Sequence, residues 1–133
     1  MSDRLRVGVI GANPDRGWAS RTHLPAVASS KHVELVAVAT TRLESASEAA
    51  KRFGARSAYA DPRELIADPS VKAVTVAVKV PEHFELVRAA LEAGKHVYSE
   101  WPLGTTTQEA VELRRYASWR EFASPLQCST ATA

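Results

Sequence analysis

Short apolar runs alternate with helix-like segments along almost the whole chain. The runs cover residues 5–10, 33–40, 73–78 and 96–99, with a shorter one around Tyr59. Strands that alternate with helices are typical of a parallel sheet, because each strand must return to the same edge through a crossover. The sequence therefore predicts an α/β fold with a doubly wound, mainly parallel sheet of the Rossmann type, whose helices cover both faces.

Residues typical of helix ends delimit most of the predicted helices. A first helix is expected over residues 18–30, and Pro25 should bend or shorten it. The other boundaries are marked by residues that start or stop helices, namely Gly54 after residues 43–53, Asp61 and Pro62 before 63–67, Pro81 and Gly94 around 81–94, and Thr105 to Thr107 before the last helix.

Composition limits the classes of protein that this chain resembles. Its 133 residues, 45% of them hydrophobic, suit one domain with its own core. The net charge of +2 is spread over interspersed acids and bases, which argues against nucleic-acid or membrane binding. Cys128 is the single cysteine and the amino terminus lacks a signal-like apolar stretch, so the cytoplasm is the expected location. His23 and His32 have no companions at metal-ligand spacing, and no metal site is expected.

The first strand-to-helix turn is the expected phosphate-binding loop. In such folds this turn places backbone N–H groups and a helix N-terminus against a pyrophosphate. Compared with G-x-G-x-x-G, the loop has Asn13 at the second glycine and one extra residue. Asparagine tolerates positive φ and can donate a side-chain hydrogen bond, so the loop stays compatible with phosphate, although an ordinary tight turn is the alternative. The expected cofactor contacts here are Gly11, Ala12, Asn13, Arg16, Gly17 and Trp18, with core packing as the other reading of the Trp18 ring.

The end of the second run bears on the choice of cofactor. An acidic residue there usually binds the ribose of NAD, and a basic residue accommodates the 2′-phosphate of NADP. This chain has Thr40, Thr41 and Arg42, with no acid before Glu44. The pattern favours NADP, but Arg42 is equally consistent with a solvated residue before a helix. The cofactor is therefore expected to be NADP or NAD.

The turn after the fourth run should line the same crevice. Val78, Lys79 and Val80 lie at the carboxyl end of that run and are expected to contact the dinucleotide, mainly through backbone groups. Two roles are open for His83: contact with the cofactor, or a place at the start of the helix without such contact. Lys95 and His96 lie at the amino end of the fifth run, away from the crevice, and both are expected to be structural.

One stretch of the chain carries a specific family pattern. It resembles the motif P-x-x-H-x-x-x-x-x-x-A-L-x-A-G-K-H-V-x-x-E-K-P-L of the Gfo/Idh/MocA oxidoreductases, and residues 6–114 are covered by the likeness. This resemblance implies a Rossmann domain that binds NAD(P), followed in full-length members by an α/β domain for a sugar or polyol, with hydride transfer to nicotinamide as the chemistry. The matching residues are Pro81, His83, Ala90, Leu91, Ala93, Gly94, Lys95, His96, Val97, Glu100, Pro102 and Leu103.

The motif departs from the family at one position that matters for chemistry. Trp101 stands where the family has a lysine near the nicotinamide, and tryptophan cannot exchange a proton at neutral pH. Glu100 and Trp101 are expected to lie on the cofactor side, but no catalytic residue is assigned. With the segment from Gly17 to Ala26, the E-W-P variant resembles a subgroup that includes the yeast galactose-pathway repressor, a non-enzymatic relative.

The resemblance also suggests how the chain is organised. We expect a Rossmann domain over residues 1–115 and an irregular tail over 116–133, truncated before the substrate domain; one hypothesis is that the final fifteen or so residues are out of frame. Such a chain should bind dinucleotide with little turnover alone. The alternatives are a dinucleotide-sensing regulatory protein without catalysis and a nonfunctional fragment that self-associates through an uncovered sheet edge.

Overall fold

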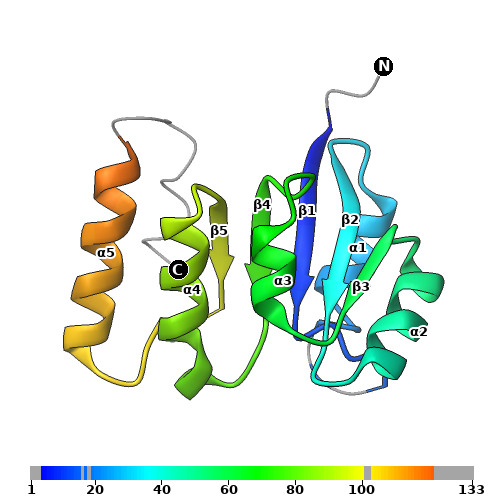
Figure 1. Cartoon of the computed structure of the whole chain (residues 1–133), viewed down its shortest axis with the longest axis horizontal. Helices are drawn as coiled ribbons and strands as arrows, with labels where there is room; N and C mark the ends of the chain where they lie inside the picture. The colour runs from blue at the N-terminus through cyan, green and yellow to red at the C-terminus, as the bar shows by residue number, and fades with distance from the viewer. Residues whose placement is uncertain (1–3, 16, 18, 101–102, 122–133) are drawn as a thin grey trace.

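The computed structural model describes residues 4–15, 17, 19–100 and 103–121, and it contains one five-stranded, all-parallel sheet in the order β3-β2-β1-β4-β5 (Figure 1). The predicted α/β, doubly wound fold is confirmed. The elements in chain order are β1 (Leu5–Ile10), α1 (His23–Ser29), β2 (Val33–Ala39), α2 (Leu43–Phe53), β3 (Ser57–Tyr59), α3 (Pro62–Ala67), β4 (Ala73–Val76), the 3-10 turn η1 (Val80–Glu82), α4 (His83–Glu92), β5 (His96–Ser99) and α5 (Thr107–Glu121).

The strand order places a topological switch point at the middle of the sheet. From β1 the chain builds outward through β2 to β3, and it then crosses back to add β4 and β5 on the other side of β1. At the carboxyl ends of β1 and β4 the connections therefore leave in opposite directions. That divergence opens the crevice where ligands bind in sheets of this kind.

Side chains from the two faces of the sheet form two buried clusters. Val9 of β1 packs with Leu24 of α1 on one face. Ile10, the next residue, packs on the other face with Leu65 of α3 and Leu91 of α4. Successive residues of a strand point to opposite faces, so one short apolar strand serves both layers. Figure 1 shows α3 and α4 in front of the sheet and α1 behind it.

The predicted helix ends at Asp61, Pro62 and Gly54 are confirmed. Asp61 caps α3 by accepting a hydrogen bond from the Arg63 backbone N–H at 2.9 Å, and Pro62 is the first helical residue. Gly54 ends α2 with φ 84°, a left-handed conformation that glycine adopts without penalty.

The first helix is shorter than predicted. It begins at His23 rather than near residue 18, which leaves Pro25 in its first turn. The missing N–H of a proline costs nothing there, because first-turn N–H groups have no partner within the helix. Of the two effects expected of Pro25, a bent or a shortened helix, the structure has the shorter helix, with the proline accommodated in its first turn.

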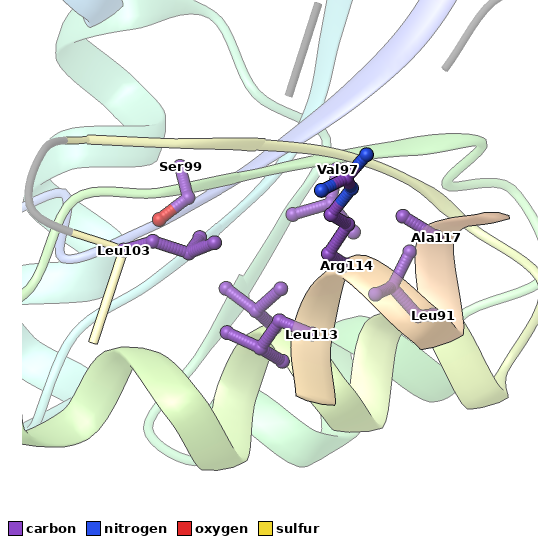
Figure 2. A pocket seen from close by; sticks show the side chains of 8 residues that line it. Leu91, Val97, Ser99, Leu103, Leu113, Arg114 and Ala117 are labelled. Atoms are coloured by element: carbon purple, nitrogen blue, oxygen red, sulfur yellow. The ribbon is translucent and has the colours of Figure 1, made fainter. Parts of the chain in front are cut away.

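The last helix is longer than predicted. It continues past residue 115, so residues 116–121 are helical and not irregular, while residues 122–133 lie outside the described part of the chain. Leu113 and Ala117, four residues apart, are 2% and 8% exposed, and they pack toward β5 and α4. Figure 2 shows Leu91, Val97 and Leu113 around the small cavity at this contact, which measures about 10 Å³.

Candidate functional site

Gly11 makes a turn at the end of β1 that no other residue can make. Its φ is 87°, and a Cβ atom would lie 2.3 Å from the carbonyl oxygen of Ala77, which follows β4. The N–H groups of Gly11 and Ala12 both donate to the Ala39 carbonyl, at 2.9 and 3.2 Å. The turn is thus held between β2 and β4, at the switch point itself.

These hydrogen bonds define how Gly11 and Ala12 shape the turn. Ala12 is fully buried, and its N–H already donates to β2. The Gly11 N–H is bonded in the same way. Both residues thus tie the start of the loop to the end of β2.

The far end of the loop leaves room for a ligand. Gly17 also has φ 87°, but among the described residues no heavy atom beyond its chain neighbours lies within 4 Å of the position that its Cβ would take. Asn13 does not use the positive φ that the sequence analysis invoked, since only glycines have positive φ among the described residues. Instead its Oδ1 accepts a hydrogen bond from the Asp15 N–H at 2.9 Å, which forms an Asx turn.

Arg52 of α2 is hydrogen-bonded to this loop, a contact that the sequence did not indicate. Its guanidinium donates to the Pro14 carbonyl at 3.0 Å. It lies 38 positions away along the chain, and no local pattern connects the two residues.

A recess of about 110 Å³ opens at the carboxyl ends of β1 and β2. It is much smaller than a whole ligand pocket, so it suits one part of a larger ligand. Four of the predicted residues meet at it: Gly11, Thr40, Thr41 and Val78. The other lining residues are Ile10, Ala39, Ala60, Pro62, Glu82 and Leu86.

The turn after β2 is held by Thr40, and it exposes Arg42. Thr40 is 7% exposed, and its Oγ1 donates to the Arg42 carbonyl at 2.6 Å, beside the Ser45 hydroxyl. The Arg42 guanidinium is paired with Glu44 at 2.9 Å, but the two side chains are 72% and 84% exposed. An exposed ion pair contributes little stability, so this guanidinium can exchange its carboxylate for a phosphate at small cost.

His83 packs beneath the next turn and does not face solvent. It is 1% exposed, and its Nε2 lies 2.8 Å from the Val78 carbonyl oxygen. This burial and this bond support the role of His83 as part of the helix start. Through this bond His83 fixes the turn that presents Val78, the exposed Lys79 and Val80.

His23 and Glu100 form a contact that the sequence analysis missed. His23 Nε2 lies 3.0 Å from Glu100 Oε2, with side-chain exposures of 18% and 23%. The Tyr98 ring stands edge-on to the imidazole at 5.7 Å between centroids. The two residues are 77 positions apart, and no local pattern in the sequence connects them.

Lys95 lies at the amino ends of the strands, on the side of the sheet opposite the crevice, and it is structural, as expected. Its ammonium group donates to the carbonyl oxygens of Asp68 and Val71, at 2.9 and 2.6 Å. Burial, reinforced by the charge of Lys72, lowers the pKa of Lys95, although the Asp68 carboxylate acts in the other direction.

Three of the expected cofactor contacts, Arg16, Trp18 and Trp101, lie outside the described residues. Within the part of the chain that the structure describes, no three metal-ligating side chains gather, and no helix is long and apolar enough to cross a membrane.

A doubly wound parallel sheet with a glycine turn at its switch point defines a dinucleotide-binding protein of the Rossmann class. The model of the Gfo/Idh/MocA oxidoreductase family, NAD-binding Rossmann fold, matches residues 5–122. The chain therefore belongs to that family, and the match extends beyond Arg114, where the resemblance in sequence was expected to fade. Its dinucleotide is NAD or NADP.

Known proteins of the family resemble the chain over most of its length. It is 37% identical to the myo-inositol 2-dehydrogenase of Thermotoga maritima, over 74% of this chain and 28% of that protein. It is 29% identical to the galactose/lactose metabolism regulatory protein GAL80 of Kluyveromyces lactis, over 93% of this chain and 29% of that protein. The crystal structure of the 3-ketoreductase KijD10 of Actinomadura kijaniata with NADP superposes with a TM-score of 0.82 at 36% identity, over 89% of this chain and 36% of that one.

The chain matches only one part of these relatives. It spans between 28% and 40% of the length of the curated proteins that it resembles. What they share with it is the dinucleotide-binding domain.

Proposed function

We propose that this chain is the cofactor-binding part of an oxidoreductase for a sugar or polyol, and that it binds NADP in preference to NAD. The observation that carries the proposal is the glycine turn at Gly11, which brings the ends of β1 and β4 together beside the recess and beside the open space at Gly17. A larger residue at either end of this loop would strain the backbone, and at Gly11 it would also collide with Ala77. The residues present thus suit a pyrophosphate laid across the switch point.

The preference for NADP rests on the end of β2. Thr41 and Arg42 are both exposed there, and the guanidinium needs only to exchange Glu44 for a 2′-phosphate. Arginine matches phosphate geometry with paired donors, and the side chain of Glu44 is too exposed to compete strongly. A relative that was crystallised with NADP is consistent with this preference.

We further propose that this chain alone turns over little or no substrate. Bound NADP would supply a hydride acceptor, and the protein would supply orientation. Trp101 offers no proton donor or acceptor at the position where the family has lysine. The chain spans about a third of the length of its relatives, so most of each of those proteins has no counterpart in the matched domain.

A second function is favoured by the same tryptophan. Trp101 and the similarity to GAL80 support a regulatory protein that binds dinucleotide without catalysis. In that case a bound dinucleotide would change affinity for a partner instead of reacting.

Self-association through β5 is a further proposal about this chain. Within the described residues β5 pairs only with β4, and Tyr98 on it is 48% exposed. An open strand edge can pair with a second copy. Size-exclusion chromatography over a hundredfold range of concentration would show a shift toward larger species, whereas a constant elution volume would contradict the idea.

The experiment that tests the main proposal is calorimetric titration of the purified chain with NADP, NADPH, NAD and NADH, followed by assays of myo-inositol and glucose oxidation. We expect micromolar binding, tighter for the phosphorylated forms, and no turnover. Failure of all four dinucleotides to bind would contradict the cofactor function. Measurable oxidation would contradict the claim that the chain is inactive alone, and a dinucleotide that changes affinity for a partner without being turned over would favour the regulatory function.

A further inference from the structure

The contact between His23 and Glu100 joins two elements that frame the crevice. His23 is the first residue of α1, the helix that follows the glycine loop, and Glu100 directly follows β5. The imidazole Nε2 and the carboxylate Oε2 are 3.0 Å apart, and both side chains are about four-fifths buried. A charged hydrogen bond in such a place is stronger than one on the open surface, because water competes less for both groups.

The contact between His23 and Glu100 lies on the side of the crevice where the nicotinamide half of a dinucleotide would extend. Thr41 and Arg42, at the end of β2, lie on the side of β1 where the adenosine ribose binds in this class of fold. A dinucleotide that crosses the switch point must extend from there toward the ends of β4 and β5. Glu100 therefore stands at the nicotinamide end of the crevice, and His23 holds its carboxylate.

The surroundings of His23 restrict its ring. Tyr98 stands edge-on to the imidazole, with an interplanar angle of 70°, and limits how the ring can turn. The carboxylate can only accept hydrogen bonds, so Nε2 is the donor. The ring contact with Tyr98 and the hydrogen bond to Glu100 thus hold the His23 ring in place before a ligand arrives.

We propose that His23 is a positioning residue for the nicotinamide half of the dinucleotide, acting through Glu100. This inference rests on the proposed dinucleotide binding and adds a residue to it. His23 does not touch the cofactor itself. It keeps the Glu100 carboxylate in one place at the end of the crevice.

The test compares two ligands that differ only in the nicotinamide ring. NADP carries it, and 2′-phospho-ADP-ribose lacks the nicotinamide ring while keeping the phosphates. His23→Ala should weaken NADP binding roughly tenfold, the loss expected for one charge-assisted hydrogen bond, and leave 2′-phospho-ADP-ribose within twofold. His23→Gln should restore most of the NADP affinity, because the glutamine amide nitrogen takes the place of Nε2 and can donate to Glu100.

Two further variants make the result specific. Glu100→Gln should weaken NADP binding selectively, and the double variant His23→Ala with Glu100→Gln should lose less than the sum of both, since each change removes the same contact. Arg56→Ala is the matched control: it breaks an ion pair of 2.6 Å with Glu34 at the opposite edge of the sheet, and it should leave both affinities unchanged.

The outcomes separate this inference from the function on which it rests. If the unaltered chain binds neither ligand, the proposed function fails and the inference fails with it. If it binds both, and His23→Ala weakens both equally or neither, the role of His23 is overturned while the binding function stands. If His23→Ala does not fold, the selective effects of His23→Gln and Glu100→Gln decide the question in the same way.

Discussion

A methyl group on Gly11 would lie 2.3 Å from the carbonyl oxygen of Ala77, which is well inside the closest approach of two atoms that are not bonded. The ends of β1 and β4 thus meet at a point where only glycine fits. The same residue has φ 87°, so it is constrained both by its conformation and by its neighbour.

Gly11→Ala should therefore cost more stability than Gly17→Ala. Both glycines have φ 87°, and the left-handed conformation alone costs an alanine about 1–2 kcal/mol. At Gly11 the collision with Ala77 adds about 1–3 kcal/mol, typical of overpacking. Urea unfolding of the two variants measures the difference in free energy, and equal losses would show that the ends of β1 and β4 are not closely packed.

Arg42→Ala should change cofactor preference without changing the fold. We expect roughly a tenfold or greater loss of NADP affinity, because a hydrogen bond to a charged group contributes about 1.5–3 kcal/mol, and no change for NAD. Glu44→Gln is the matched control, since it frees the guanidinium from its ion pair, and it should keep or raise NADP affinity. Parallel losses for NADP and NAD in Arg42→Ala would contradict a role in phosphate recognition.

Lys95 should make stability depend on pH in the alkaline range. Its pKa is lowered in the folded chain by burial and by Lys72, so the unfolded chain holds this proton to higher pH. Between the folded value and the ordinary lysine value of about 10.4, the free energy of unfolding should rise with pH relative to Lys95→Met. Urea unfolding from neutral pH upward measures this difference; a flat or falling difference would contradict the account, and Lys51→Met on the exposed side of α2 is the control.

The packing of α5 gives a test of where the domain ends. Leu113 is 2% exposed against α4 and β5, and Leu113→Ala should cost about 2–4 kcal/mol of stability. Val111 lies on the same helix but is 45% exposed, so Val111→Ala should cost well under 1 kcal/mol. Similar small losses for both variants in thermal or urea unfolding would mean that α5 is not docked as described.

Strands and helix ends could be predicted from the sequence where they depend on neighbouring residues. Strand β1, strand β5, the cap at Asp61 and the left-handed glycine at the end of α2 were all predicted, because each depends on residues close together in the chain. The start of α1 was not, since it depends on how Pro25 fits a first turn. The end of α5 was missed because Ala117 is too small to extend a visible hydrophobic period.

The candidate site was predictable in outline only. The loop from Gly11 to Gly17 and the turn at Thr40 were located correctly, but sequence could not tell which N–H groups are already bonded. His83 was ambiguous because its burial depends on the packing of the turn after β4. The contact of His23 with Glu100 joins residues 77 positions apart, and only the sheet topology brings them together.

The most direct test of dinucleotide binding at this edge of the sheet is an NMR titration of the isotopically labelled chain with NADP, in which amide shifts are followed residue by residue. We predict that the largest changes occur at residues 13–17, at Thr41 and Arg42, and at residues 78–82, while Lys72 and Lys95 at the opposite edge stay unchanged. Shifts that concentrate at the amino ends of the strands, or no saturable shifts at millimolar NADP, would contradict dinucleotide binding at the carboxyl ends.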